Sequence, residues 1–291
     1  MPDAAVNCAD PCVAHVRFAT DKIGYAYGDE PVSSDTSQAF LMTTNGGRSW
    51  RREPGGADAL ETLDGNVIRV VDAGNCPPGC RFRVQLAPIG STAWRTVALP
   101  GSQGGGDSVQ LVRTGRLAAL EVYANPAGGA SALSVLFTST DDGATWTRRG
   151  EPCPRAAGSG SGFGNEIDSS RLTSAPDGSM SVLCMTRGEI GPQFTMTSID
   201  GGAHFVTADR NALGSAAISA FATASARTVL VSSDATYRST DGGGHFARLS
   251  PGQVAWLGFA SPTVGHAISS DRRTIWTTTD AGLRWSQHTF A

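Results

Sequence analysis

The chain has 291 residues, a net charge of −3 and 40% hydrophobic residues, which is enough apolar material for a folded core. The slight excess of acidic residues argues against nucleic acid as a general partner, because phosphate binding requires a basic face. No run of 18 apolar residues occurs, so the sequence predicts no membrane-spanning helix.

Six cysteines, the first of them near the N-terminus, fall into pairs. Cys8–Cys12 and Cys76–Cys80 each enclose a turn with proline, and Cys153–Cys184 is the pair that remains by elimination. An even number of cysteines spaced in this way predicts three disulfides and an oxidising compartment. Zinc is the alternative, but the tight pairs lie far apart and the histidines are scattered. We therefore expect no metal.

Residues 1–12 contain neither the basic segment nor the apolar segment of a signal peptide. Disulfides without a signal suggest that this sequence is part of a secreted or lipid-anchored protein, so we expect an extracytoplasmic location.

One octapeptide recurs along the chain with the pattern Ser/Thr-x-Asp-x-Gly-x-x-aromatic. Its copies span residues 43–50, 139–146, 198–205, 239–246 and 278–285, with Asn45, Asp141, Asp200, Asp241 and Asp280 at the third position. The hydroxyl and the carboxylate can accept hydrogen bonds from nearby backbone N–H groups, and glycine supplies a positive φ. The pattern predicts a structural corner that needs no ligand.

The spacing of these corners gives the fold. Trp94 divides the longest gap, although the turn before it is degenerate, and six units of about 47 residues result, the period of a four-stranded propeller blade. We predict a single all-β domain, a six-bladed β-propeller with four antiparallel strands per blade, with seven blades as the fallback. After an N-terminal segment, 1–12, the blades are expected at 13–55, 56–100, 105–150, 165–210, 214–250 and 251–291.

A second repeat supports the first. Phe18-x5-Gly24 matches Phe259-x5-Gly265, and each reads as an inner strand, a short turn and a second strand. The last unit ends with its own fourth strand, 284–290, which predicts closure without strand exchange. We expect the following aromatic residues to be largely buried: Phe18, Trp50, Trp94, Phe137, Trp146, Phe205, Phe221, Phe246, Phe259 and Trp285.

The octapeptides resemble the Asp-box, or bacterial neuraminidase repeat. With the Phe-x5-Gly signature, the chain is similar over residues 13–290 to Asp-box propellers such as the photosystem II assembly factor family, sortilin-type receptors and sialidases. The resemblance implies the fold more strongly than a function, because these propellers include both enzymes and binders.

The resemblance also implies where a ligand would bind. The Asp-boxes are expected between the third and fourth strands of each blade, and ligands on the opposite face. Phe163 lies in a glycine-rich stretch that is either a flexible crossing or a mobile lid. The candidate binding residues on this face are Asp29, Glu30, Phe163, Arg187, Glu189, Asp234, Asp271, Arg272 and Arg273.

Two enzyme readings remain as alternatives. A sialidase needs three arginines, a tyrosine nucleophile activated by glutamate, and an acidic aspartate; Glu121 and Tyr123 are the nearest approach to that pair. Another glycoside hydrolase could use two loop carboxylates, for which the candidates are Asp29, Glu30, Glu166, Asp168, Glu189 and Asp234. No nucleotide-binding, zinc-protease or serine-hydrolase motif occurs. We predict a monomeric, non-catalytic binding or scaffold protein for a protein or glycan ligand, without a cofactor.

Overall fold

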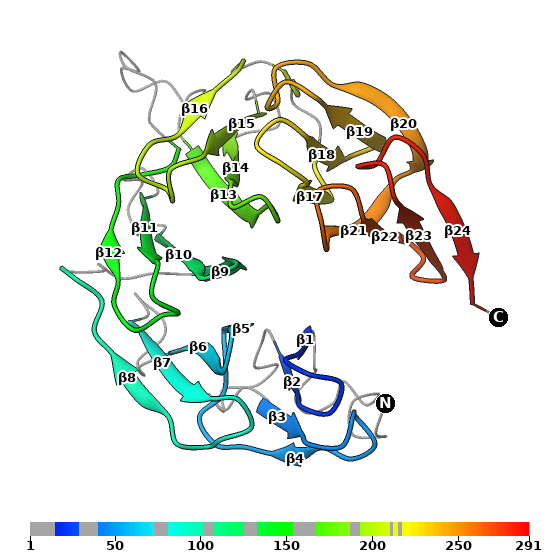
Figure 1. The fold of residues 1–291 in the computed structure, drawn as a ribbon. Coiled ribbons are helices and arrows are strands. Elements are labelled where there is room, and N and C mark those ends of the chain that lie inside the picture. The colour runs from blue at the N-terminus through cyan, green and yellow to red at the C-terminus, as the bar shows by residue number, and fades with distance from the viewer. Residues whose placement is uncertain are drawn as a thin grey trace. The chain divides into compact units, whose positions relative to one another are not determined.

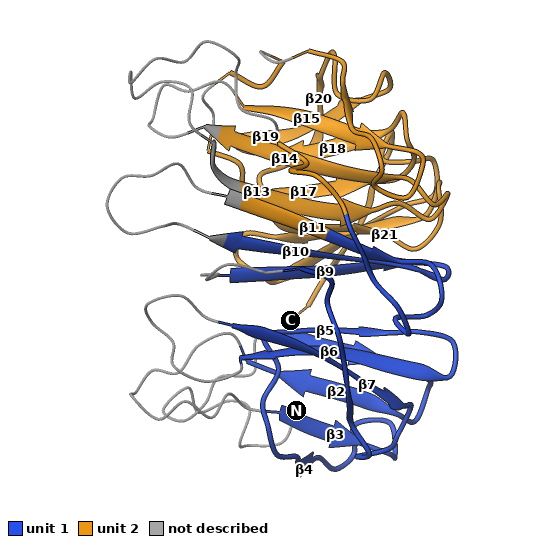
Figure 2. Ribbon diagram, turned by 90° about the vertical axis from the view of Figure 1, so that its left-hand side faces the viewer, with its two compact units in different colours: residues 1–124, 137–148 blue, residues 125–136, 149–291 orange. Residues whose placement is uncertain are grey.

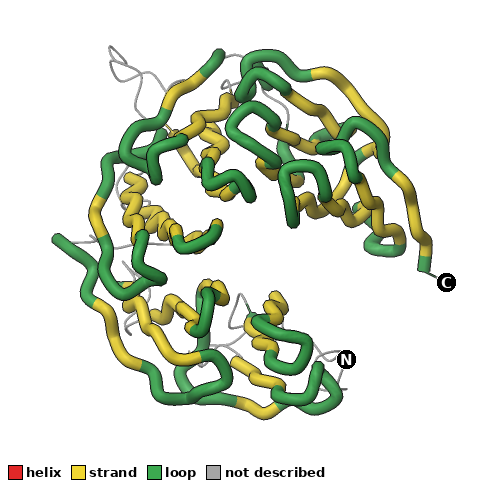
Figure 3. The backbone as a smooth tube through the Cα atoms, viewed as in Figure 1, coloured by secondary structure: helices red, strands yellow, loops and turns green. Residues whose placement is uncertain are grey.

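The computed structural model describes residues 15–28, 40–72, 81–101, 108–124, 133–153, 167–186, 193–209, 212–214 and 217–290. In these residues 24 strands form six four-stranded antiparallel sheets without any helix (Figures 1 and 3). The protein is therefore a six-bladed β-propeller, as its sequence predicts. Among the described residues, no helix has the length and hydropathy needed to cross a bilayer.

Each sheet is built from four strands that are consecutive in the chain. The first three sheets contain β1 (His15–Phe18), β2 (Gly24–Tyr27), β3 (Phe40–Thr43) and β4 (Arg51–Arg52); β5 (Ala59–Thr62), β6 (Asn66–Asp72), β7 (Phe82–Pro88) and β8 (Arg95–Val97); and β9 (Ser108–Thr114), β10 (Leu117–Ala124), β11 (Leu133–Ser139) and β12 (Thr147–Arg148).

The other three sheets follow the same order. They contain β13 (Ile167–Ser174), β14 (Met180–Thr186), β15 (Gln193–Ser198) and β16 (Val206–Thr207); β17 (Ala220–Thr223), β18 (Val229–Ser232), β19 (Ala235–Ser239) and β20 (Ala247–Gly252); and β21 (Val254–Phe259), β22 (Gly265–Ser269), β23 (Thr274–Thr278) and β24 (Ser286–Thr289). The last sheet thus has its own fourth strand.

The chain forms two compact units (Figure 2). The first comprises residues 1–124 and 137–148, and the second comprises residues 125–136 and 149–291. Within the first unit, β1, β5 and β9 lie next to one another, and within the second unit β13, β17 and β21 do so. In each unit the first strands of successive sheets therefore lie side by side.

The five octapeptides form the predicted corners between the third and fourth strands. The hydroxyl of the first residue donates to the side chain of the third at 2.7–3.0 Å and accepts the backbone N–H of the fifth at 2.8–3.0 Å. The side-chain oxygen of the third residue accepts the N–H of the seventh at 2.8–3.0 Å. All five hydroxyl residues are 1–2% exposed, so each corner satisfies its buried polar atoms internally.

The glycine at the fifth position has two separate reasons to be glycine. Its φ is positive in all five corners, between 79° and 100°. In three of the corners it also lies against the preceding sheet: a Cβ at Gly143 would clash with Ile68, one at Gly243 with Thr195, and one at Gly282 with Leu230. The corner therefore closes its own sheet and fits against its neighbour.

The second sheet lacks this corner and uses side chains of the first sheet. Gly90 donates its N–H to the hydroxyl of Tyr25 at 2.8 Å. The guanidinium of Arg69 lies 4.1 Å from the ring of Trp94 and 5.0 Å from that of Phe40. Burial lowers the pKa of Arg69 to about 10, and its N–H groups are bonded to Gln85 and to two backbone carbonyls. An arginine stacked on aromatic rings of both sheets thus packs between the first and second sheets.

The second sequence repeat has a direct packing cause. Phe18 is paired with Gly24 and Phe259 with Gly265. In both pairs the phenylalanine ring covers the glycine so closely that an added Cβ would come within 2.7 Å of a ring carbon. The spacing Phe-x5-Gly is therefore set by a ring lying across a two-stranded hairpin.

The predicted burial of the ten aromatic residues is only partly correct. Phe137 and Trp146 are buried, whereas Phe18 is 46% exposed. The other seven are partly buried. Phe18 lies on the face of the first sheet opposite Tyr25, and it is Tyr25 and Phe40 that form the core with the second sheet. The sequence repeat identified a ring that packs on its own hairpin rather than between sheets.

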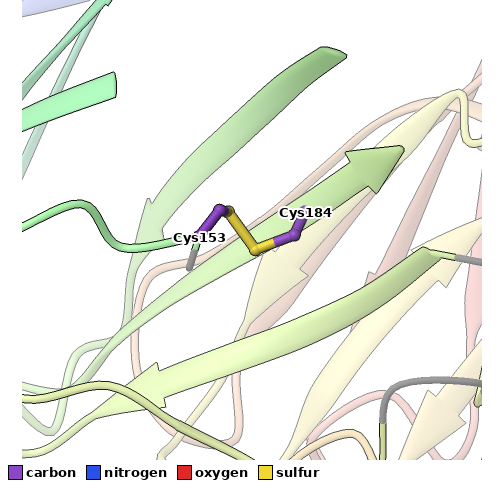
Figure 4. The surroundings of a disulfide bond; sticks show 2 residues. All are labelled: Cys153 and Cys184. Atoms are coloured by element: carbon purple, nitrogen blue, oxygen red, sulfur yellow. A yellow bond between two sulfur atoms is a disulfide. The ribbon is translucent and has the colours of Figure 1, made fainter. Parts of the chain in front are cut away.

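A disulfide joins Cys153 and Cys184 (Figure 4), the pair left by elimination in the sequence. Cys184 lies on β14, and Cys153 lies in the segment that leads toward the fourth sheet. Both side chains are buried. The bridge therefore anchors this segment to the second strand of the sheet. The other four cysteines lie outside the described residues.

We predict that Gly282→Ala destabilises the protein more than Gly178→Ala. Both glycines have positive φ, but a Cβ at Gly282 would lie 2.7 Å from Leu230, whereas nothing lies within 4 Å at Gly178. The additional loss should be about 1–3 kcal/mol, the usual cost of overpacking. Urea unfolding of both variants measures it. Equal losses would mean that the corner does not depend on its fit to the neighbouring sheet.

We also predict that replacing Cys153 and Cys184 together by alanine lowers the free energy of unfolding by about 3–4 kcal/mol, because the bridge closes a loop of 31 residues. Urea unfolding without reductant compares the variant with the wild type, and unfolding in dithiothreitol is the control, in which the difference should shrink. An unchanged midpoint in the variant would contradict the prediction.

Candidate functional site

The two ends of each sheet differ in what their side chains do. In a four-stranded meander the first and third turns share one end, and the second turn lies at the other. At the corner end, the N–H groups of Gly46, Gly242 and Ala281 bond carbonyls of the first turn of their own sheets. The hairpins between the second and third strands therefore lie at the opposite end, and of these the structure describes the ones after β18 and β22.

The side chains at the third position of the corners are engaged within the corners. The backbone N–H of His204 chiefly holds the pKa of Asp200 well below its usual range, and that of Arg284 likewise lowers the pKa of Asp280. Such carboxylates stay ionised and fully bonded. This arrangement fits the structural role predicted for Asn45, Asp141, Asp200, Asp241 and Asp280.

The hairpin after β18 carries Asp234. Its carboxylate accepts hydrogen bonds from the hydroxyls of Ser233 and Tyr237, each at 2.9 Å. Both bonds lower the pKa of Asp234, and the bond from Ser233 has the larger effect. For Tyr237, the bond to Asp234 raises the pKa of the phenol. An exposed, ionised carboxylate suits ligand binding better than proton donation.

The hairpin after β22 carries Asp271, Arg272 and Arg273, all exposed. The carboxylate of Asp271 accepts the hydroxyl of Ser269 at 2.5 Å and the N–H of Arg273 at 3.0 Å. The Ser269 bond is the main cause that lowers the pKa of Asp271. Asp271 therefore fixes the turn, and the two arginines are presented to solvent on a defined backbone.

The residues proposed for a hydrolase do not form an open site in the described residues. Glu121 and Tyr123 lie two residues apart on β10 and so on one side of the strand, but Glu121 is 1% exposed. A substrate could not reach a carboxylate buried to that extent. Asp168 lies on β13, and its side chain is outside the described residues.

Several predicted residues cannot be placed. Asp29, Glu30, Phe163, Glu166, Arg187 and Glu189 lie outside the described residues. Of the described carboxylates, cysteines and histidines, no three or more are grouped so as to hold a metal ion.

The structure reveals a charged group that sequence reasoning missed, on the first strands of the first unit. Glu61 on β5 is 3.4 Å from Nε of Arg17 on β1. Arg113 on β9 bonds the carbonyl of Thr62 and, at 3.1 Å, the carboxylate of Asp64. Burial raises the pKa of Glu61, and Arg17 opposes this. The charges alternate across three sheets, which no local motif could indicate.

These geometries can be set beside known proteins. No family model and no curated protein matches the chain. Among solved structures it is similar to YCF48 from Cyanidioschyzon merolae, with a TM-score of 0.58 and 14% identity over 94% of this chain and 83% of that one. It is also similar to the polysaccharide lyase Uly1, with a TM-score of 0.60 and 9% identity over 98% and 82%.

A third similar structure is the α-L-arabinofuranosidase Arb93A from Fusarium graminearum, with a TM-score of 0.55 and 12% identity over 96% of this chain and 94% of that one. A further structure shows YCF48 bound to a D1 peptide. At these identities the likeness supports the β-propeller fold alone, and the similar proteins include both a binder and enzymes.

We predict that His245 titrates at higher pH in the wild type than in Asp241→Asn. Nδ1 of His245 lies 2.6 Å from the Asp241 carboxylate, and this bond raises the pKa of His245. The bond therefore stabilises the corner fully below about 6.5, the ordinary histidine value, and less as pH rises through the raised pKa. Proton–carbon NMR of the imidazole measures the shift, with Asp280→Asn as the control. Identical titrations in wild type and Asp241→Asn would refute the pairing.

Proposed function

We propose that this protein is an extracytoplasmic binding or scaffold propeller that recognises a protein or glycan at the end of its sheets opposite the Asp-box corners. The observation that carries the proposal is the contrast between the two ends. The corner carboxylates accept hydrogen bonds from their own corners. The hairpin after β22 instead holds Arg272 and Arg273 exposed on a turn fixed by Asp271.

Three further facts support this proposal. The buried disulfide suits an oxidising compartment. One similar structure, YCF48, is titled as bound to a peptide. The described carboxylates at the hairpins have lowered pKa values and so are poor proton donors. The alternative, a glycoside hydrolase, is favoured by the likeness to an arabinofuranosidase and weakened by the burial of Glu121.

The test begins with a peptide phage library and a glycan array, screened with the wild type. Any ligand found is then measured with Arg272→Ser/Arg273→Ser and with Arg227→Ser/Arg284→Ser. Both variants lose two positive charges in the second unit, the first at the hairpin end and the second at the corner end. We expect the hairpin variant to bind at least about tenfold more weakly than the wild type, because it loses charged contacts with the ligand. The corner variant should bind as the wild type does.

The enzyme reading is tested on the same preparations. Fluorogenic sialosides and arabinofuranosides should give no turnover above a buffer blank. Turnover by the wild type above that blank would replace the binding proposal by a hydrolase. Equal loss of binding in the two arginine variants would place recognition away from the hairpins.

A further inference from the structure

The outermost strands of the first unit carry only positive charge. Their sequences are Arg-Arg in β4, Arg-Thr-Val in β8 and Thr-Arg in β12, without any aspartate or glutamate. Arg51 pairs with Glu53 at 2.7 Å. Arg52, Arg95 and Arg148 are exposed and form no ion pair with any described residue. We call these three residues the arginine edge; each sheet of the unit contributes one.

Packing between the sheets connects the arginine edge. Trp94, which precedes Arg95, lies 5.8 Å from Phe40, the first residue of the strand that pairs with β4. Gly101, just after β8, lies against Arg148: a Cβ built there would be 3.6 Å from its Cδ. The three arginines therefore belong to one continuous run of packed sheets.

One alternative explanation is that charges on outer strands prevent sheets from pairing edge to edge. That role would be needed equally in the second unit. There the outer strands are Val-Thr in β16, a strand with a single arginine in β20, and Ser-Gln-His-Thr in β24. Val206 on β16 is even 70% exposed. Edge protection therefore does not explain why most of the outer-strand arginines belong to the first unit.

The chemistry of the arginine edge selects among anionic partners. A peptide adding as a strand needs a longer template than the two residues of β4 or β12. A membrane surface would favour exposed apolar side chains beside the cations, and the large exposed ones described in this unit, Val16 and Phe18, lie on β1 instead. Separate guanidinium groups on successive sheets suit a chain that repeats its carboxylates or sulfates, since arginine binds such groups in a bidentate manner.

We propose that the arginine edge binds an acidic polysaccharide. This surface is separate from the hairpins of the proposed function and does not depend on them. The polysaccharide would lie along the outer strands of the first unit, with carboxylate or sulfate groups at Arg52, Arg95 and Arg148 in turn.

The experiment uses the full chain with polygalacturonate and heparin as probes and neutral dextran as the blank. Arg52→Ser/Arg95→Ser/Arg148→Ser is compared with Arg227→Ser/Arg248→Ser/Arg284→Ser, which loses the same charge from exposed positions of the second unit, away from the hairpins. We expect wild-type binding to at least one acidic probe at about 50 mM salt, falling about tenfold by roughly 250 mM because counterions compete for the arginines. The edge variant should bind at least about tenfold more weakly, and the control variant as the wild type does.

Any of three results would overturn the proposal. The first is that neither acidic probe binds at low salt. The second is that the control variant loses as much affinity as the edge variant, which would make net charge the cause. The third is that vesicles of phosphatidylglycerol compete fully with the polysaccharide, which would make lipid headgroups the ligand. Thermal unfolding of both variants checks that a loss of binding is not a loss of fold.

Discussion

A buried hydroxyl that donates one hydrogen bond and accepts another holds each repeated corner in place. The hydroxyls of Thr43, Ser139 and their three counterparts bond the carboxylate or amide of the third residue and the N–H of the fifth. Because they are nearly inaccessible to water, the loss of either partner would leave a buried polar atom unpaired, which is costly. These hydrogen bonds hold a tight turn with positive φ, and in three corners a further N–H, such as that of Gly46 to the carbonyl of Lys22, ties the corner to the first turn of the same sheet.

The same corner also joins sheets. Where the buried hydroxyl forms the corner, the glycine at the fifth position leaves room for a side chain of the preceding sheet, such as Ile68 at Gly143. The second sheet shows the alternative, because it lacks the buried hydroxyl. There the hydroxyl of Tyr25 accepts the hydrogen bond of the turn, and Arg69 packs on the ring of Trp94. A propeller can thus lose a corner if the neighbouring sheet provides a polar group and an aromatic stack in its place.

The residues that form the corners differ from those that we propose as ligand contacts. The corner carboxylates have lowered pKa values because they are already bonded, so they are unsuited to bind or transform a ligand. By contrast, Arg272 on a hairpin and Arg52, Arg95 and Arg148 on outer strands are exposed. The fold can therefore accept different ligands while its corners stay the same.

The sequence by itself determined the six-sheet architecture, because the corner is a local structure: its hydroxyl, acid and glycine lie within five residues of one another. It also indicated that Phe18 and Phe259 pack on nearby glycines, but it could not show that Phe18 stays largely exposed, since that depends on which face meets the second sheet. Only the tertiary structure brought Arg17, Glu61 and Arg113 together from three sheets and buried Glu121. Such contacts depend on how distant strands pack, and no spacing within one segment of chain records that packing.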